Sequence, residues 1–300
     1  MSTLGRSTTF GSPLPVTVVV PTLGRETLRC CLKSLRSCWP QPSEVLIVVQ
    51  GAPARVQAMV DAGEGPTGTR VIADPGRGVS SSTNYGLRLA THRTVLVTHD
   101  DCEVSPSWVG AAATSARAYT GAIITGRVMP GGDPDRVPSC KTDRTPHDYT
   151  GTRCVGALYP NNMVLPRDEV LALGGFDERF GPDEAAEDCD FCYRWLCAGL
   201  PLRFDPAMVV RHNDWRSKED LERLFVRYAR GSGAVYGKHL RRGDPHIARF
   251  LLNDFVAALH GKIRLLRGRP SWTDPRQSIL LGLLGGLIFG LRHLGPEGTR

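Results

Sequence analysis

Two aspartates follow directly on an apolar, β-branched segment in the sequence TVLVTHDD, which ends at Asp101. If that segment is a buried strand, its end carries the carboxylates of Asp100 and Asp101 and the imidazole of His99 to one edge of a sheet. Mg²⁺ and Mn²⁺ bind oxygen ligands and keep coordination positions for phosphate and water. The segment therefore predicts a metal site for a phosphorylated ligand. Two solvated loop aspartates would give the same local pattern.

A second acidic segment, GFDERFGPDEAAEDCDFCYRW, carries seven carboxylates: Asp177, Glu178, Asp183, Glu184, Glu187, Asp188 and Asp190. A helix over 185–198 would place Glu187 and Asp188 in its first turn, where the helix dipole favours negative charge. A carboxylate held at a cleft can take a proton from an attacking hydroxyl. Simple N-terminal capping by acidic residues is the alternative interpretation.

These side chains need a scaffold, and the first half of the chain predicts one. Apolar strand candidates alternate with helical patterns; the strands are 16–20, 45–49, 70–73 and 95–98. Continuously apolar strands imply a sheet covered on both faces, and the alternation implies parallel βαβ units of an α/β fold. Ligands bind at the carboxyl ends of such strands. Residues 21–26, Gln50, 74–78 and 99–101 should therefore share one edge.

The rest of the chain changes in character. A strand over 122–129 leads into a long polar loop at 130–146, followed by a strand over 158–165 and extended segments at 203–205 and 208–210. Helices are predicted over 217–236 and from Asp244–Pro245 to Leu266. The apolar segment 279–291 is 13 uncharged residues, short of the ~20 that span a bilayer. We interpret it as a packing or membrane-surface helix.

Charge is unevenly distributed along the 300 residues. Residues 216–300 contain 16 Lys and Arg against 7 Asp and Glu, and the whole chain has a net charge of +7. This surplus favours peripheral contact with an anionic membrane, although a solvated arginine-rich surface explains it equally well. Without interleaved aromatic residues, it does not indicate nucleic-acid binding. The nine cysteines and polar opening residues predict free thiols in a cytoplasmic protein, at the inner face of the cell membrane if the membrane contact holds.

Six motifs occur in a characteristic order: VVVPTLGRE, EVLIVV, DPGRGVSSSTNYGL, TVLVTHDDC, NNMVLPRDEVLALGGFDE and AAEDCDFCYRW. In this order the chain resembles family 2 inverting glycosyltransferases of GT-A fold over residues 16–212. The resemblance implies a GT-A type, Rossmann-like, mostly parallel sheet flanked by helices. It implies a catalytic domain over 1–215, with a nucleotide-binding half at about 14–110 and an acceptor half at about 111–215. The charge and helical pattern of residues 216–300 predict a basic, helical C-terminal region.

The resemblance also implies roles for individual residues. Donor-binding residues would be Pro21, Thr22, Arg25, Glu26, Gln50, Asp74, Gly78, Asn84 and Asp100. The metal would be held by Asp101, with His99 and His212 as further ligands. Asp188 would be the general base, with Glu187 beside it. The family usually has acids where His99 and Gln50 stand; imidazole can still coordinate Mn²⁺, and glutamine can bond a base edge.

The implied reaction moves a sugar, with inversion, from a nucleotide diphosphate sugar to an acceptor hydroxyl, using Mn²⁺ or Mg²⁺. The charged C-terminal region favours an acceptor in cell-envelope glycan or glycolipid synthesis. Tailoring of a soluble natural product and a catalytically silent nucleotide-binding protein of the same fold stay open. The sequence predicts neither the acceptor, the donor base nor the oligomeric state. The hypothesis requires that Asp101 and Asp188 meet at one cleft.

Overall fold

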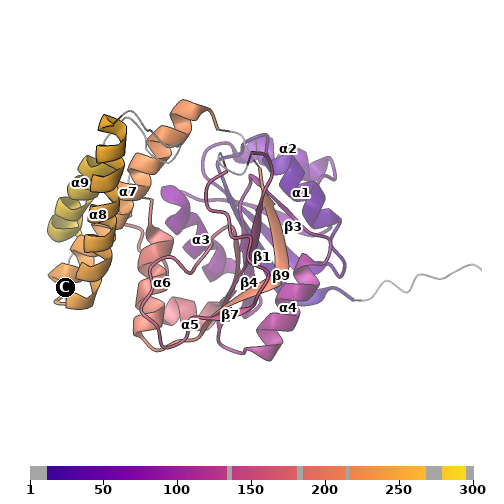
Figure 1. Ribbon diagram of the computed structural model, residues 1–300. Helices are drawn as coiled ribbons and strands as arrows, with labels where there is room; N and C mark the ends of the chain where they lie inside the picture. Colours follow the sequence, from indigo (N-terminus) through magenta and orange to yellow (C-terminus); the bar gives the residue numbers. More distant parts are fainter. Residues whose placement is uncertain (1–11, 134–136, 181–184, 214–215, 268–278, 295–300) are drawn as a thin grey trace, which may run out of the picture.

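The computed structural model describes residues 12–133, 137–180, 185–213, 216–267 and 279–294. Its centre is a nine-stranded sheet with the main strand order β3-β2-β1-β4-β8-β6-β9-β5, and β7 pairs with β9. Helices cover both faces of the sheet, and three C-terminal helices stand together beyond one of these layers (Figure 1). The α/β class and the helical C-terminal extension predicted from the sequence are confirmed.

The first half of the sheet is parallel. Its strands are β1 (Leu14–Thr22), β2 (Pro42–Val49), β3 (Thr69–Ala73) and β4 (Thr94–Thr98). The helices between them are α1 (Leu28–Arg36), α2 (Pro53–Asp61) and α3 (Gly78–Leu89). Apolar side chains leave both faces of the central strands: Val18 and Val20 join one core with α1, whereas Val19 joins the other with α3. This two-sided burial explains why these strands are continuously apolar.

The second half mixes strand directions. It contains β5 (Cys102–Val104), β6 (Ile123–Pro130), β7 (His147–Asp148), β8 (Asn162–Pro166) and β9 (Leu202–His212). The accompanying helices are α4 (Trp108–Ala118), α5 (Arg167–Ala172) and α6 (Glu187–Cys197). β8 runs antiparallel to β4 and β6, and β5 runs antiparallel to β9. The β5–β9 pair places the chain after Asp101 opposite His212.

The C-terminal region comprises α7 (Lys218–Arg241), the short 3-10 turn η1 (Pro245–Ile247), α8 (Ala248–Leu266) and α9 (Ile279–His293). Ser217 caps α7 by accepting a hydrogen bond from the Asp220 amide at 3.1 Å. Glycines let α9 lie against the α7 backbone: a Cβ on Gly286 would come 1.8 Å from the Arg230 carbonyl oxygen. No helix in the described ranges is long and apolar enough to cross a membrane.

Several elements differ from their predicted form. The two extended segments at 203–205 and 208–210 form a single strand, β9, with a register irregularity against β6 between Gly126 and Arg127. The strand predicted over 158–165 begins only at Asn162, after Pro160. Helices α2 and α4 were not predicted, because Gly- and Ala-rich surroundings weaken their apolar periodicity. Asp183, Glu184 and part of the 130–146 loop lie outside the described residues.

Candidate active site

A cleft of about 790 Å³ opens at the carboxyl ends of β1, β2 and β4. The sequence-predicted residues in its lining are Pro21, Thr22, Arg25, Gln50, Gly78, His99, Asp100, Asp101 and Glu187. Eight of these come from the ends of parallel strands or the loops that follow them, as expected for such a sheet. Glu187 reaches the same cleft from the start of α6. The cleft therefore brings together acidic residues that lie almost ninety positions apart.

Asp101 and His212 face each other across the β5–β9 pair. The Asp101 Oδ2 atom lies 3.5 Å from His212 Nε2, and both side chains are buried. His212 Nδ1 is 2.8 Å from the Pro138 carbonyl oxygen. Because a carbonyl can only accept, Nδ1 must be the donor; when the ring is neutral, this leaves a lone pair on Nε2. These two groups and the Cys102 thiol have ligand atoms within 4.8 Å of one another, a spacing suited to a metal ion.

His99 lines the same cleft but is not one of the three clustered residues. Its Nε2 atom is shielded from solvent and has no hydrogen-bond partner among the residues that the structure describes. Burial lowers the pKa of His99 to about 4, against the attraction of nearby Asp101. The ring is therefore neutral near pH 7 and carries an imidazole nitrogen without a partner. An imidazole of this kind can ligate Mn²⁺.

Asp100 links the first loop to β4. It accepts hydrogen bonds from Thr22 Oγ1 at 2.6 Å and from Arg25 Nη1 at 3.1 Å. Burial raises the pKa of Asp100, whereas Arg25 and Thr22 oppose that shift. Asp100 thus fixes the loop that carries Thr22 and Arg25 along the wall of the cleft.

Gln50 and Asp74 order residues 74–78, the loop between β3 and α3. The Gln50 side chain bonds both the amide and the carbonyl of Gly78 at 3.0 Å, and donates to Asp74 at 2.7 Å. Burial opposes the charge of Asp74, but hydrogen bonds led by that from Gln50 lower its pKa. Asp74 also accepts the Gly76 amide and the Ser82 hydroxyl. This network orders the start of α3, and it uses polar atoms that the sequence had assigned to donor binding.

Glu187 and Asp188 begin α6. Glu187 lines the cleft, and its pKa rises to about 8 because it is buried and lies beside the charge of Asp188. Burial also raises the pKa of Asp188, while its Oδ1 accepts the Cys189 amide at 2.9 Å. Asp188 itself is not among the cleft-lining residues. Ionisation of Asp188 therefore opposes ionisation of Glu187.

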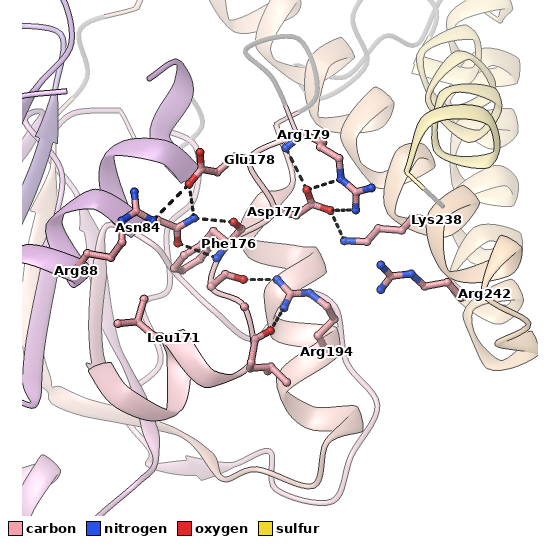
Figure 2. A pocket seen from close by; sticks show the side chains of 13 residues that line it. Asn84, Arg88, Leu171, Phe176, Asp177, Glu178, Arg179, Arg194, Lys238 and Arg242 are labelled. Atoms are coloured by element: carbon pink, nitrogen blue, oxygen red, sulfur yellow. Dashed lines mark hydrogen bonds and ion pairs between the residues drawn. The ribbon is translucent and has the colours of Figure 1, made fainter. Parts of the chain in front are cut away.

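Asp74 does not line the cleft, and two more residues assigned to donor binding lie outside its lining. Asn84 is buried and holds the loop that contains Phe176 and Glu178. It donates to the Phe176 carbonyl at 2.8 Å and to Glu178 at 2.9 Å, and it accepts a hydrogen bond from the Phe176 amide (Figure 2). Glu26 is exposed and pairs with Arg29 and with Arg55 at 2.6 Å. Neither lines the cleft, because Asn84 sits a turn and a half beyond the start of α3 and Glu26 points outward.

Sequence reasoning missed two arginines of the cleft. Arg216 and Arg227 belong to the basic C-terminal region, yet both line the cleft. The Arg216 guanidinium lies 3.7 Å from Asp101 Oδ2, and the charge of Arg227 counteracts the raised pKa of Glu187. The local charge surplus was visible in the sequence. Its position was not, because only the packing of α7 beside α6 brings Arg227 to the cleft.

The sequence profile described as Glycosyl transferase family 2 matches residues 17–165. Among curated protein sequences, none matches the chain. The fold is similar to that of a mannosyltransferase, PcManGT from Pyrobaculum calidifontis, solved with GDP-Man and Mn²⁺: the TM-score is 0.62 at 17% identity, covering 94% of this chain and 88% of that one.

Two further solved structures share the fold. One is S. aureus TarS 1-349 in complex with UDP, with a TM-score of 0.54 at 14% identity, covering 92% of this chain and 91% of that one. The other is GalNAc-T7 with UDP, GalNAc and Mn²⁺, with a TM-score of 0.53 at 15% identity over 77% of this chain. The present chain spans only 51% of GalNAc-T7. At these identities the likeness establishes a common GT-A architecture.

Proposed function

We propose that this chain is a glycosyltransferase that transfers sugar with inversion from a nucleotide diphosphate donor in a metal-dependent reaction. Residues 17–165 match the profile of glycosyl transferase family 2, and the fold is GT-A. The observation that carries the proposal is the single cleft that holds both Asp101 and Glu187. Similar folds have been solved with UDP or GDP-Man, two of them with Mn²⁺. These ligands support a nucleotide-sugar donor here.

Asp101, His212 and His99 would hold Mn²⁺ or Mg²⁺. When bound, the ion neutralises charge that develops on the leaving diphosphate. The orphaned Nε2 of His99 and the 3.5 Å spacing of Asp101 and His212 support this assignment. Arg216 and Arg227 add positive charge along the same cleft, where they can bind the diphosphate oxygens.

The acceptor hydroxyl would attack the anomeric carbon from the face opposite the diphosphate. The new C–O bond forms as the bond to the diphosphate breaks, and the diphosphate leaves with the electron pair. The hydroxyl proton passes to the carboxyl pair of Glu187 and Asp188, with Asp188 as the base. Glu187 lines the cleft and, in this proposal, shares the accepted proton with its neighbour.

The C-terminal helices support an acceptor at an anionic membrane surface. Large apolar side chains are exposed on α8 and α9: Leu252, Val256, Leu259, Leu281, Leu284, Ile288 and Leu291. Together with the basic surplus of residues 216–300, they suit peripheral binding at the inner face of the cell membrane. This favours a cell-envelope glycan or glycolipid over a soluble natural product as acceptor. Sedimentation with phosphatidylglycerol vesicles, but not with phosphatidylcholine vesicles, is the expected result.

A donor screen tests the proposed function. Thermal unfolding is measured with UDP- and GDP-sugars, with and without Mn²⁺; a donor at 100 times its Kd should add about 2.7 kcal/mol of stability. The best donor is then offered to acceptor pools, and the anomeric configuration of the product is determined. Metal-dependent stabilisation with an inverted product supports the proposal. Donor binding without turnover would favour the silent nucleotide-binding alternative, and a retained configuration would refute inversion.

A further inference from the structure

A second cavity, of about 550 Å³, is lined in part by the loop that contains Phe176 (Figure 2). Residues 174–179 line it, whereas Phe180, the next residue, lines the active-site cleft. Residues of α3, α5, α6 and α7 also line it. Five cationic side chains line it: Arg88, Arg179, Arg194, Lys238 and Arg242. None of these five lines the catalytic cleft.

The cavity carries a positive surplus. Its lining includes the carboxylates of Asp177 and Glu178, and Asp190 lies beneath it, bonded to Lys238. Burial works against the charge of Asp177, but Arg179 and Lys238 outweigh burial and hold its pKa at about 2. Asp177 is therefore ionised at neutral pH. Five cations against three carboxylates leave a surplus of two positive charges.

Most of these cations are engaged within the protein. Lys238 Nζ lies 2.7 Å from both Asp177 and Asp190, and Arg194 bonds Asp190 and two backbone carbonyls. Arg179 forms a paired contact with Asp177. These bonds hold the side chains of Lys238, Arg194 and Arg179 in place along the cavity.

Arg242 differs from the other cations that line the cavity. It directly follows α7, is exposed, and its guanidinium makes no hydrogen bond or ion pair within the described part of the chain. Figure 2 shows the guanidinium directed toward the cavity. Arg88, on α3, lies across the cavity from Arg242. Among the described residues its one ion pair is a long one, at 3.8 Å from the Glu178 carboxylate. Guanidinium groups bind carboxylate and phosphate oxygens through charge-assisted hydrogen bonds, so each of these two side chains can contact an anionic group in the cavity.

We propose that this cavity binds an anionic ligand through its phosphate or carboxylate groups, with Arg242 and Arg88 as direct contacts. The ligand is either a small free anion or an acidic glycan that extends over from the cleft. Ser82, in the cleft, and Arg88 are six residues apart on α3, which is about 9 Å along a helix. A chain of two or three sugars can cover that distance.

The test compares Arg242→Glu with Arg267→Glu in the full chain. Arg267 directly follows α8 as Arg242 follows α7, and both are exposed, so the control matches residue type, charge change and position at a helix end. Binding of inorganic phosphate, galacturonate and polygalacturonate is measured by calorimetry at constant ionic strength, without donor or metal. Thermal unfolding without ligand verifies that both variants fold.

We expect wild type and Arg267→Glu to bind at least one probe with equal affinity, and Arg242→Glu to bind it at least about tenfold more weakly, because a charge-assisted contact is lost. Tighter binding of phosphate or galacturonate indicates a small anion, whereas tighter binding of polygalacturonate per chain indicates an acidic glycan. Equal affinities in all three proteins, or no binding of any probe, would overturn the proposal. Neither result depends on sugar transfer, so failure here leaves the proposed function standing.

Discussion

Replacement of Gly286 by alanine should separate α9 from α7. An ideal Cβ at this position would lie 1.8 Å from the Arg230 carbonyl oxygen, whereas ordinary contact begins at 3.4 Å, so the helices must move apart by about 1.6 Å. The obstacle is backbone, which cannot turn away as a side chain can. Overpacking of this kind costs roughly 1–3 kcal/mol, and a shift along a whole helix interface places the cost near the upper end.

The neighbouring Gly285 provides a matched control. A Cβ there meets nothing within 4 Å, so Gly285→Ala should stabilise α9 by up to about 1 kcal/mol through helix propensity alone. Propensity cancels between the two variants, and the expected difference is therefore about 3 kcal/mol in the free energy of unfolding.

For a chain of this size, a difference of about 3 kcal/mol corresponds to roughly 6–12 °C in Tm, measured by circular dichroism on heating. Limited proteolysis should also release the C-terminal helix earlier from Gly286→Ala. If the two alanine variants unfold within about 1 °C of each other, the close α7–α9 contact is wrong.

Four further predictions concern charge and metal. The pKa of Glu187 is about 8 in the folded state, above its ordinary value of 4.5, so the free energy of unfolding should fall as pH rises from about 4.5 to about 8. Glu187→Gln should abolish that fall when denaturation is measured across this pH range. The transfer rate should rise as pH increases toward about 8, because the carboxyls of Glu187 and Asp188 lose their proton there. If Asp188 is the base, Asp188→Asn should lower kcat by about 100-fold or more, and near-full activity in that variant would refute the assignment. Lys238→Met should cost about 3–5 kcal/mol in urea unfolding, because it leaves the buried carboxylate of Asp190 with fewer partners; a neutral result would mean that the buried ion pair is unimportant. Chelation by EDTA should stop transfer until Mn²⁺ is restored. Asp101→Asn should reduce transfer at least about 100-fold and should lose the stabilisation that Mn²⁺ gives. If neither EDTA nor Asp101→Asn changes the activity, there is no catalytic metal at this site.

Local sequence pattern determined the parallel half of the sheet and the edge at which ligands bind. Strands such as β1 and β2 are apolar on both faces, and this property is written in consecutive residues. Once the strands are parallel, their carboxyl ends must share an edge, so Thr22, Gln50 and Asp101 could be placed together from the sequence. The resemblance in motif order then indicated what that edge does.

Tertiary structure decided which polar side chains reach the ligand and which hold the scaffold. Asn84 and Glu26 lie in the expected segments, but their neighbours, which come from other segments, direct Asn84 to a separate loop and Glu26 to solvent. Arg227 and Arg242 reach two different cavities only because α7 packs against α6. Such contacts depend on helix packing between distant parts of the chain, and no residue pattern within α7 alone encodes which neighbour it meets.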